Sequence, residues 1–208
     1  MSVSPLATRI LARVPRRALT DPQAELLASY CKLLAHWNRS TNLTALTLEA
    51  FPDRTLDLLI AEPLAASELV RPDSANWLDF GSGGGSPAIP IKVARARLEL
   101  TMVESRSRKA AFLREAVRTL DLPRTAVWLG RIEELGSAAG SADLVTIRAV
   151  RIGPAILRTA AAVLKPGGRF VIFGRRQAPA LGDAPFSPGS VVDSPINGSR
   201  IHSFIRQS

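Results

Sequence analysis

The residues most suggestive of chemistry form a glycine cluster, Gly81-Ser82-Gly83-Gly84-Gly85, after a short apolar segment that ends at Phe80. A glycine in a regular element destabilises a fold by about 0.5–1 kcal/mol relative to alanine, so four glycines within five positions need a reason. Because glycine has no Cβ, its backbone can come close to a ligand. The cluster predicts a binding loop between a strand and the next helix.

Two familiar nucleotide loops do not fit this stretch. Ser86 stands where a G-x-G-x-x-G loop needs its third glycine, and the phosphate loop G-x-x-x-x-G-K-[ST] is absent. The stretch instead reads Asp79-x-Gly81-x-Gly83-x-Gly85, which resembles motif I of class I S-adenosylmethionine-dependent methyltransferases. That cofactor has no phosphate, and its ammonium and sulfonium groups are cationic. A nearby carboxylate such as that of Asp79 therefore suits it.

A second acid, Glu104, ends the next expected strand. A carboxylate at this place can accept hydrogen bonds from two ribose hydroxyls, as it does in dinucleotide-binding folds. We therefore predict that Asp79, Gly81, Gly83 and Glu104 define a pocket for S-adenosylmethionine. The alternative is a tight strand-to-helix turn that binds no ligand.

The elements that would position these residues alternate between strand-like and helical patterns. Strands are expected at 76–80, 98–104, 125–130, 142–148 and 169–173, helices at 86–96, 106–122 and 152–164, and late strands at 190–193 and 201–206. This alternation indicates an α/β fold with a doubly wound, mostly parallel sheet. Such sheets bind ligands beyond the carboxyl ends of their strands, which is where the glycine loop and Glu104 would lie.

The N-terminal third has a different pattern. Apolar residues recur at helical spacing over 20–40 and 56–69, and Lys165-Pro166-Gly167-Gly168 is expected to stop the last core helix. We expect residues 1–70 to form an N-terminal arm and helical extension, and residues 71–208 to form the cofactor-binding core. The arm carries several arginines that could reach phosphates or belong to a disordered segment: Arg9, Arg13, Arg16 and Arg17.

Composition limits the partners. The 27 lysines and arginines exceed the 18 acids and give a net charge of +9, which favours a polyanionic partner over a neutral one, although a solubility adaptation would look the same. Cys31 is the single cysteine, which fits a reducing compartment and a small buried side chain. No apolar run is long enough to cross a membrane and no secretory signal is evident. We expect a cytoplasmic monomer without a metal.

Several motifs together narrow the family. They occur in a fixed order: WNRSTNLTAL (37–46), DFGSGGGSPAIP (79–90), ESRSRKAAFLR (104–114), GRIEEL (130–135) and ADLVTIRAV (142–150). This set resembles the bacterial small-subunit (16S) ribosomal RNA guanine-N7 methyltransferases, formerly called glucose-inhibited division protein B. The resemblance implies a Rossmann-like class I methyltransferase that uses S-adenosylmethionine. It also implies ribosomal RNA or the small ribosomal subunit as the partner.

The resemblance implies roles for individual residues. Gly81 and Ser86 would contact the methionine part of the cofactor, Ile132 and Glu133 would frame its adenine, and Arg148 would lie at the pocket mouth as the catalytic residue. The expected cofactor-binding residues are Asp79, Gly81, Ser82, Gly83, Ser86, Glu104, Ile132, Glu133 and Arg148. The alternative for Arg148 is a solvated arginine at a strand end.

The chain departs from the family pattern at the expected RNA-facing surface. Arg54 and Leu58 replace the histidine and serine of a His-x-x-Asp-Ser segment, and Arg175 or Arg176 stands where the family has a lysine near Gly174. No acid–base constellation is evident, which fits guanine N7 because that atom attacks with a bare lone pair. The alternative function is a non-catalytic or small-molecule-directed S-adenosylmethionine-binding domain that has lost the RNA target.

Overall fold

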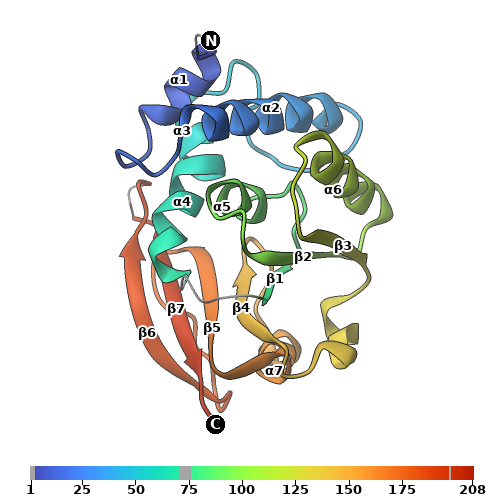
Figure 1. Cartoon of the computed structure of the whole chain (residues 1–208). Coiled ribbons are helices and arrows are strands. Elements are labelled where there is room, and N and C mark those ends of the chain that lie inside the picture. Colours follow the sequence, from blue (N-terminus) through green and yellow to red (C-terminus); the bar gives the residue numbers. More distant parts are fainter. Residues whose placement is uncertain (1–2, 71–75, 197) are drawn as a thin grey trace.

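A computed structural model describes residues 3–70, 76–196 and 198–208. Within this part of the chain the strands form one sheet in the order β3-β2-β1-β4-β5-β7-β6 (Figure 1). Their bounds are β1 Asn76–Phe80, β2 Glu99–Glu104, β3 Thr125–Leu129, β4 Ala142–Ile147, β5 Leu164–Arg175, β6 Phe186–Asp193 and β7 Arg200–Arg206. Strands β1 to β5 pair in parallel, while β7 is antiparallel to β5 and β6 to β7. The predicted doubly wound, mostly parallel sheet is confirmed.

The central strands are apolar because helices cover both faces of the sheet. All of β1 except its first residue is buried, and so is all of β4 except Asp143. Continuous burial of this kind is typical of parallel strands between two helical layers. The strand order reverses between β1 and β4, so a crevice opens at their carboxyl ends. The glycine loop follows β1 at this crevice.

Helices divide between the two faces. The described helices are α1 Pro5–Leu11, α2 Asp21–Asn38, α3 Asp53–Leu56, the π turn η1 Asp57–Ala61, α4 Glu62–Ala65, η2 Ala66–Leu69, α5 Ala88–Ala94, α6 Ser107–Thr119, η3 Ile132–Ala138 and α7 Pro154–Val163. Buried residues of α2, η1, α5 and α6 belong to one hydrophobic cluster, and those of α7 belong to a second cluster with Val145 and Phe170. The sheet separates these two clusters.

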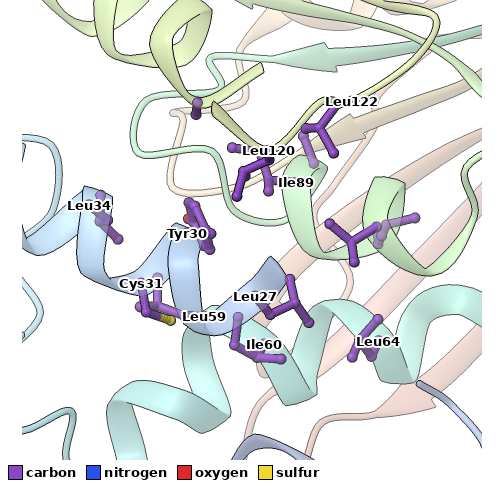
Figure 2. Packing of buried hydrophobic residues seen from close by; sticks show 14 of the residues in the cluster. Leu27, Tyr30, Cys31, Leu34, Leu59, Ile60, Leu64, Ile89, Leu120 and Leu122 are labelled. Carbon is purple, nitrogen blue, oxygen red and sulfur yellow. The ribbon is translucent and has the colours of Figure 1, made fainter. Parts of the chain in front are cut away.

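Helix α2 joins the N-terminal segment to the core. A reciprocal pair of hydrogen bonds between Thr20 and Gln23 caps its start. Figure 2 shows Leu27 and Tyr30 of this helix among side chains from η1 and α5, such as Ile60 and Ile89. The helical extension therefore shares its core with the sheet. The predicted division into 1–70 and 71–208 stays a prediction, and residues 71–75 beside this boundary lie outside the described residues.

The N-terminal arm differs from its prediction. Residues 5–11 form helix α1, where either a phosphate-binding arm or disorder was expected. Arg9 lies 2.9 Å from Asp53, and Arg13 lies 2.6 Å from Asp57. These two cations are thus neutralised within the chain. The first ion pair joins α1 to α3, and the second joins the segment just after α1 to the π turn.

The last third has longer strands than its sequence predicted. Helix α7 ends at Val163, just before the expected stop signal, but β5 starts at once at Leu164 and includes Pro166. The two late strands are confirmed as an antiparallel pair, although β6 starts at Phe186. The short helix η3 after β3 was not predicted. None of the described helices combines the length and apolar character needed to cross a membrane.

Candidate active site

Backbone conformation and neighbouring side chains together explain the glycines of the loop. Gly81 has φ +70°, and a Cβ there would lie 2.6 Å from Cγ2 of Val150. Gly85 has φ +88°, and a Cβ there would lie 2.5 Å from Cδ1 of Ile89. At Gly83 the nearest atom would be a backbone oxygen at 3.7 Å. Gly83 also has a positive φ, +50°, so the backbone favours glycine at all three positions, but at Gly83 no neighbouring side chain would crowd a Cβ and the loop is open to a ligand.

Glu104 ties this loop to the adjacent strand. Its Oε2 accepts a hydrogen bond from the Gly83 N–H at 2.9 Å, and its Oε1 accepts one from the Arg106 N–H at 2.8 Å. Each carboxylate oxygen can accept a further hydrogen bond. Glu104 therefore holds the loop in place and keeps acceptor capacity for two hydroxyls.

A cavity of about 770 Å³ opens at this edge of the sheet. Most of the predicted cofactor-binding residues line it: Gly81, Ser82, Gly83, Ser86, Glu104, Ile132 and Arg148. Glu133 does not line this cavity; it is exposed and borders an adjoining hollow that shares Ile132. Asp79 lies behind the loop. The structure thus brings seven of the nine predicted residues onto one wall.

Asp79 is buried beneath the glycine loop. The Thr146 hydroxyl donates to Asp79 Oδ1 at 2.5 Å and accepts from the Trp77 indole N–H at 2.8 Å. Asp79 Oδ2 has no hydrogen-bond partner among the described residues. Burial raises the pKa of the Asp79 carboxyl to about 6. A buried carboxylate with an unpaired oxygen suits a cationic ligand in front of it.

This burial leads to a stability prediction. Folding raises the pKa of Asp79 to about 6, so the folded protein still binds a proton at pH values where the unfolded chain has released it. The unfolding free energy of wild type is therefore highest below the unfolded pKa, falls as pH rises, and levels off above about pH 6. Asparagine never ionises, so Asp79→Asn should not show this fall. We expect the difference in unfolding free energy between the variant and wild type to increase by about 1–1.5 kcal/mol from pH 5 to pH 8, in favour of the variant. The same variant should bind S-adenosylmethionine more weakly.

Denaturant unfolding at several pH values measures this difference. Asp183→Asn, which alters an exposed aspartate far along the chain, is the matched control and should follow wild type throughout. An Asp79→Asn curve parallel to wild type from pH 5 to pH 8 would show that Asp79 does not titrate there.

Arg148 follows β4 and lies against the π turn. Its Nη1 donates to the Leu58 carbonyl at 2.6 Å and to the Ser86 hydroxyl at 3.1 Å, and its Nη2 donates to Glu62 at 2.5 Å. Its side chain is 16% exposed, so the alternative of a solvated strand-end arginine does not describe it. Arg148 is therefore fixed in one place on the pocket wall.

The π turn itself has a local cause. Pro63 has no N–H to donate to the carbonyls one turn before it. The Leu58 and Leu59 carbonyls accept instead from Arg148 and from the Ser86 hydroxyl. Wide turns of this type often occur at functional sites. Here the turn directs two carbonyls toward the pocket.

Three further residues shape the site and were missed from the sequence. The Tyr30 hydroxyl donates to the Gly84 carbonyl at 2.6 Å, and its burial raises its pKa well above the usual value. Asn38 accepts from the N–H groups of Leu43 and Thr44, which lie on the pocket wall. Glu62 is fully buried against Arg148. The available signal for Glu62 was an acid in the middle of the apolar run LLIAEPLAA (58–66).

The residues present fit S-adenosylmethionine. The unpaired Asp79 oxygen suits its cationic groups, Glu104 suits ribose hydroxyls, and the open side of Gly83 admits a ligand. No group of three or more histidines, cysteines or acids arranged to hold a metal occurs among the described residues. Strand order, glycine loop and strand-end acid together define a class I S-adenosylmethionine-dependent methyltransferase.

Known proteins agree with this class. A sequence model of the family "rRNA small subunit methyltransferase G" matches residues 23–180. A Ribosomal RNA small subunit methyltransferase G from Nitratidesulfovibrio vulgaris is 37% identical over 158 residues, 75% of this chain and 72% of that protein. One from Stenotrophomonas maltophilia is 36% identical over 174 residues, 81% of this chain and 78% of that protein. The chain belongs to this family.

Solved structures resemble the fold at low sequence identity. A SAM-dependent methyltransferase from Aquifex aeolicus has a TM-score of 0.57 at 15% identity, and covers 76% of this chain and 95% of its own. TrmN from Thermus thermophilus has a TM-score of 0.55 at 20% identity, and covers 69% of this chain and 48% of its own. These likenesses concern the fold alone.

Proposed function

We propose that this chain transfers the methyl group of S-adenosylmethionine to N7 of a guanine in small-subunit ribosomal RNA. The bound cofactor supplies an electrophilic methyl group on a sulfonium. The chain's own residues have three tasks: holding the cofactor, admitting the base and balancing the charge that moves in the reaction.

The observation that carries the proposal is the small set of ionisable groups on the pocket wall, which among the described residues are Glu104, Arg106, Lys109 and Arg148. Among the described residues, no histidine, cysteine, tyrosine or aspartate lines the cavity. Glu104 is tied to the loop by two backbone N–H groups, and its remaining acceptor capacity is assigned to the ribose hydroxyls. Cys31 is buried away from the cavity, and burial raises the pKa of its thiol to about 12, so it is no nucleophile. An acceptor without a proton to lose, such as guanine N7, suits this wall.

Positive charge at the mouth supports a polyanionic substrate. Arg106 and Lys109 line the cavity, and a neighbouring hollow is lined by Arg108 and by the hydroxyl residues Ser40 and Thr41. Arg106 and Lys109 line both spaces, so these cations lie between the cavity and the neighbouring hollow. Asn42, exposed, borders both spaces. RNA phosphates beside the target base would meet these groups.

A methyl-transfer assay tests the proposal. Labelled S-adenosylmethionine is incubated with the protein and with naked small-subunit RNA, assembled small subunits or free guanosine. We expect transfer to RNA or subunits, at a site that becomes sensitive to reductive strand cleavage, which is specific for 7-methylguanine. Cofactor binding without transfer to any of these acceptors would favour the non-catalytic domain.

Salt dependence tests the polyanionic partner. We expect RNA affinity to fall about tenfold or more between roughly 50 and 200 mM salt, because each neutralised phosphate releases counterions. Filter binding over this range measures the slope, and S-adenosylmethionine affinity serves as a reference that should change little. A flat RNA affinity would contradict binding through phosphates.

A further inference from the structure

Glu62 is a buried carboxylate that the proposed reaction does not use. It opens helix α4, directly after the π turn, and is fully buried. A buried charge is costly unless it is paired and hydrogen-bonded, so its partners show what it does. Those partners come from two distant parts of the chain, the end of β4 and the connection between β6 and β7.

One oxygen of Glu62 binds a residue of the pocket wall and the other binds residues next to the C-terminal strands. Its Oε2 binds the Arg148 guanidinium at 2.5 Å. Its Oε1 accepts from the hydroxyl groups of Ser194 at 2.8 Å and Ser199 at 3.0 Å. Ser194 directly follows β6 and Ser199 directly precedes β7. One carboxylate thus links the pocket wall to the edge of the sheet.

The serines lie outside the part of the chain that matches the family. The family model ends at residue 180, so β6, β7 and both hydroxyls belong to the remainder of this chain. Figure 1 shows α4 beside β6 and β7 at one side of the sheet. The C-terminal strands therefore contact the wall of the candidate active site through Glu62.

Arg148 needs such a partner for geometric and electrostatic reasons. Its planar fork can hold Leu58, Ser86 and Glu62 together only in one orientation. An unpaired guanidinium on this wall would also repel a cationic sulfonium, and the Glu62 carboxylate cancels that charge.

We propose that Glu62 is a positioning residue, which holds the Arg148 guanidinium at the pocket wall and makes the β6–β7 connection part of the support of the active site. The inference about methyl transfer rests on the proposed function. The inference about Arg148 orientation does not, because it concerns the protein without ligand.

The first test observes Arg148 directly. Nitrogen-15 NMR of the ligand-free protein records arginine side-chain N–H signals, and the Arg148 signal is assigned by its loss in Arg148→Lys. We expect this signal to shift and broaden in Glu62→Gln, and also in Ser194→Ala/Ser199→Ala, which keeps the ion pair but removes both hydroxyls. Asp143→Asn is the control, because it breaks an ion pair with Lys165 at the start of β4 and β5. This variant should leave the Arg148 signal unchanged.

The second test is a double-mutant cycle on the single-turnover rate at saturating cofactor and RNA. We expect Glu62→Gln to lower the rate about tenfold or more in wild type, with little change in KM for S-adenosylmethionine, and to lower it less than twofold in the Arg148→Lys background. Equal losses in both backgrounds would overturn the proposal, as would an unchanged Arg148 signal in the double serine variant. A wild-type protein without transferase activity would contradict only the proposed function. The NMR experiment on the ligand-free protein would still decide whether Glu62 positions Arg148.

Discussion

We expect Glu104→Gln to bind S-adenosylmethionine about 10²-fold more weakly than wild type. An amide has one acceptor oxygen, so it cannot accept from both the Gly83 and Arg106 N–H groups, and its NH₂ end would face a donor. Losing a hydrogen bond to a charged acceptor costs about 1.5–3 kcal/mol, and the ribose hydroxyls lose their acceptor as well. A total near 3 kcal/mol corresponds to this factor.

Isothermal titration with the cofactor measures the change. Glu99→Gln alters an exposed glutamate at the other end of the same strand and should bind like wild type. A loss of less than about threefold in Glu104→Gln would place the ribose elsewhere and would contradict the pocket as described.

The second large effect concerns Arg148→Lys. One ammonium cannot reach the Leu58 carbonyl, the Ser86 hydroxyl and Glu62 in the fork geometry that the guanidinium uses. We expect the variant to fold with a loss of about 1–3 kcal/mol, since a buried acceptor stays unpaired. It should keep most of its cofactor affinity. Its single-turnover rate should fall about 10²-fold, the scale expected when a positioned electrostatic group is lost.

Arg158→Lys is the matched control, because Arg158 is an exposed arginine of α7 on the other face of the sheet. It should retain the wild-type rate and stability. A rate within about threefold of wild type in Arg148→Lys would leave Arg148 with a structural role only. Loss of cofactor affinity at an unchanged rate would make it a cofactor clamp instead.

Local chemistry explains what could be predicted from the sequence. The glycine loop, Glu104 and the strand-helix alternation are signals within short windows, and the sheet brings strand ends to one edge by topology. The predicted pocket wall follows from that rule. Glu133, which the resemblance places beside the adenine, is exposed on the adjoining hollow because η3 starts with Ile132 turned toward the cavity, and its role there stays a prediction.

The remaining site residues depend on contacts between distant parts of the chain. In the sequence Tyr30 is one more apolar position of an amphipathic helix. Its hydroxyl has a partner, the Gly84 carbonyl, only because α2 packs on the glycine loop. Glu62 has partners near residues 148, 194 and 199, which no local pattern connects. Helix α1 was missed for the same reason, because the ion pairs of Arg9 in α1 and of Arg13 just after it join this segment to residues 53 and 57.

The shared core of α2 and the sheet also bears on the order in which the chain can fold. During synthesis α2 leaves the ribosome well before the residues that it packs against. Tyr30 packs near Ile89, and the ring centroids of Trp37 and Phe112 lie 5.9 Å apart. Until those residues emerge, the apolar face of α2 has only α1 and its neighbours to cover it. Such transiently uncovered surface attracts chaperones and promotes aggregation in nascent chains. The extension that completes the pocket wall is thus also a segment whose apolar face stays uncovered until α5 and α6 have been made.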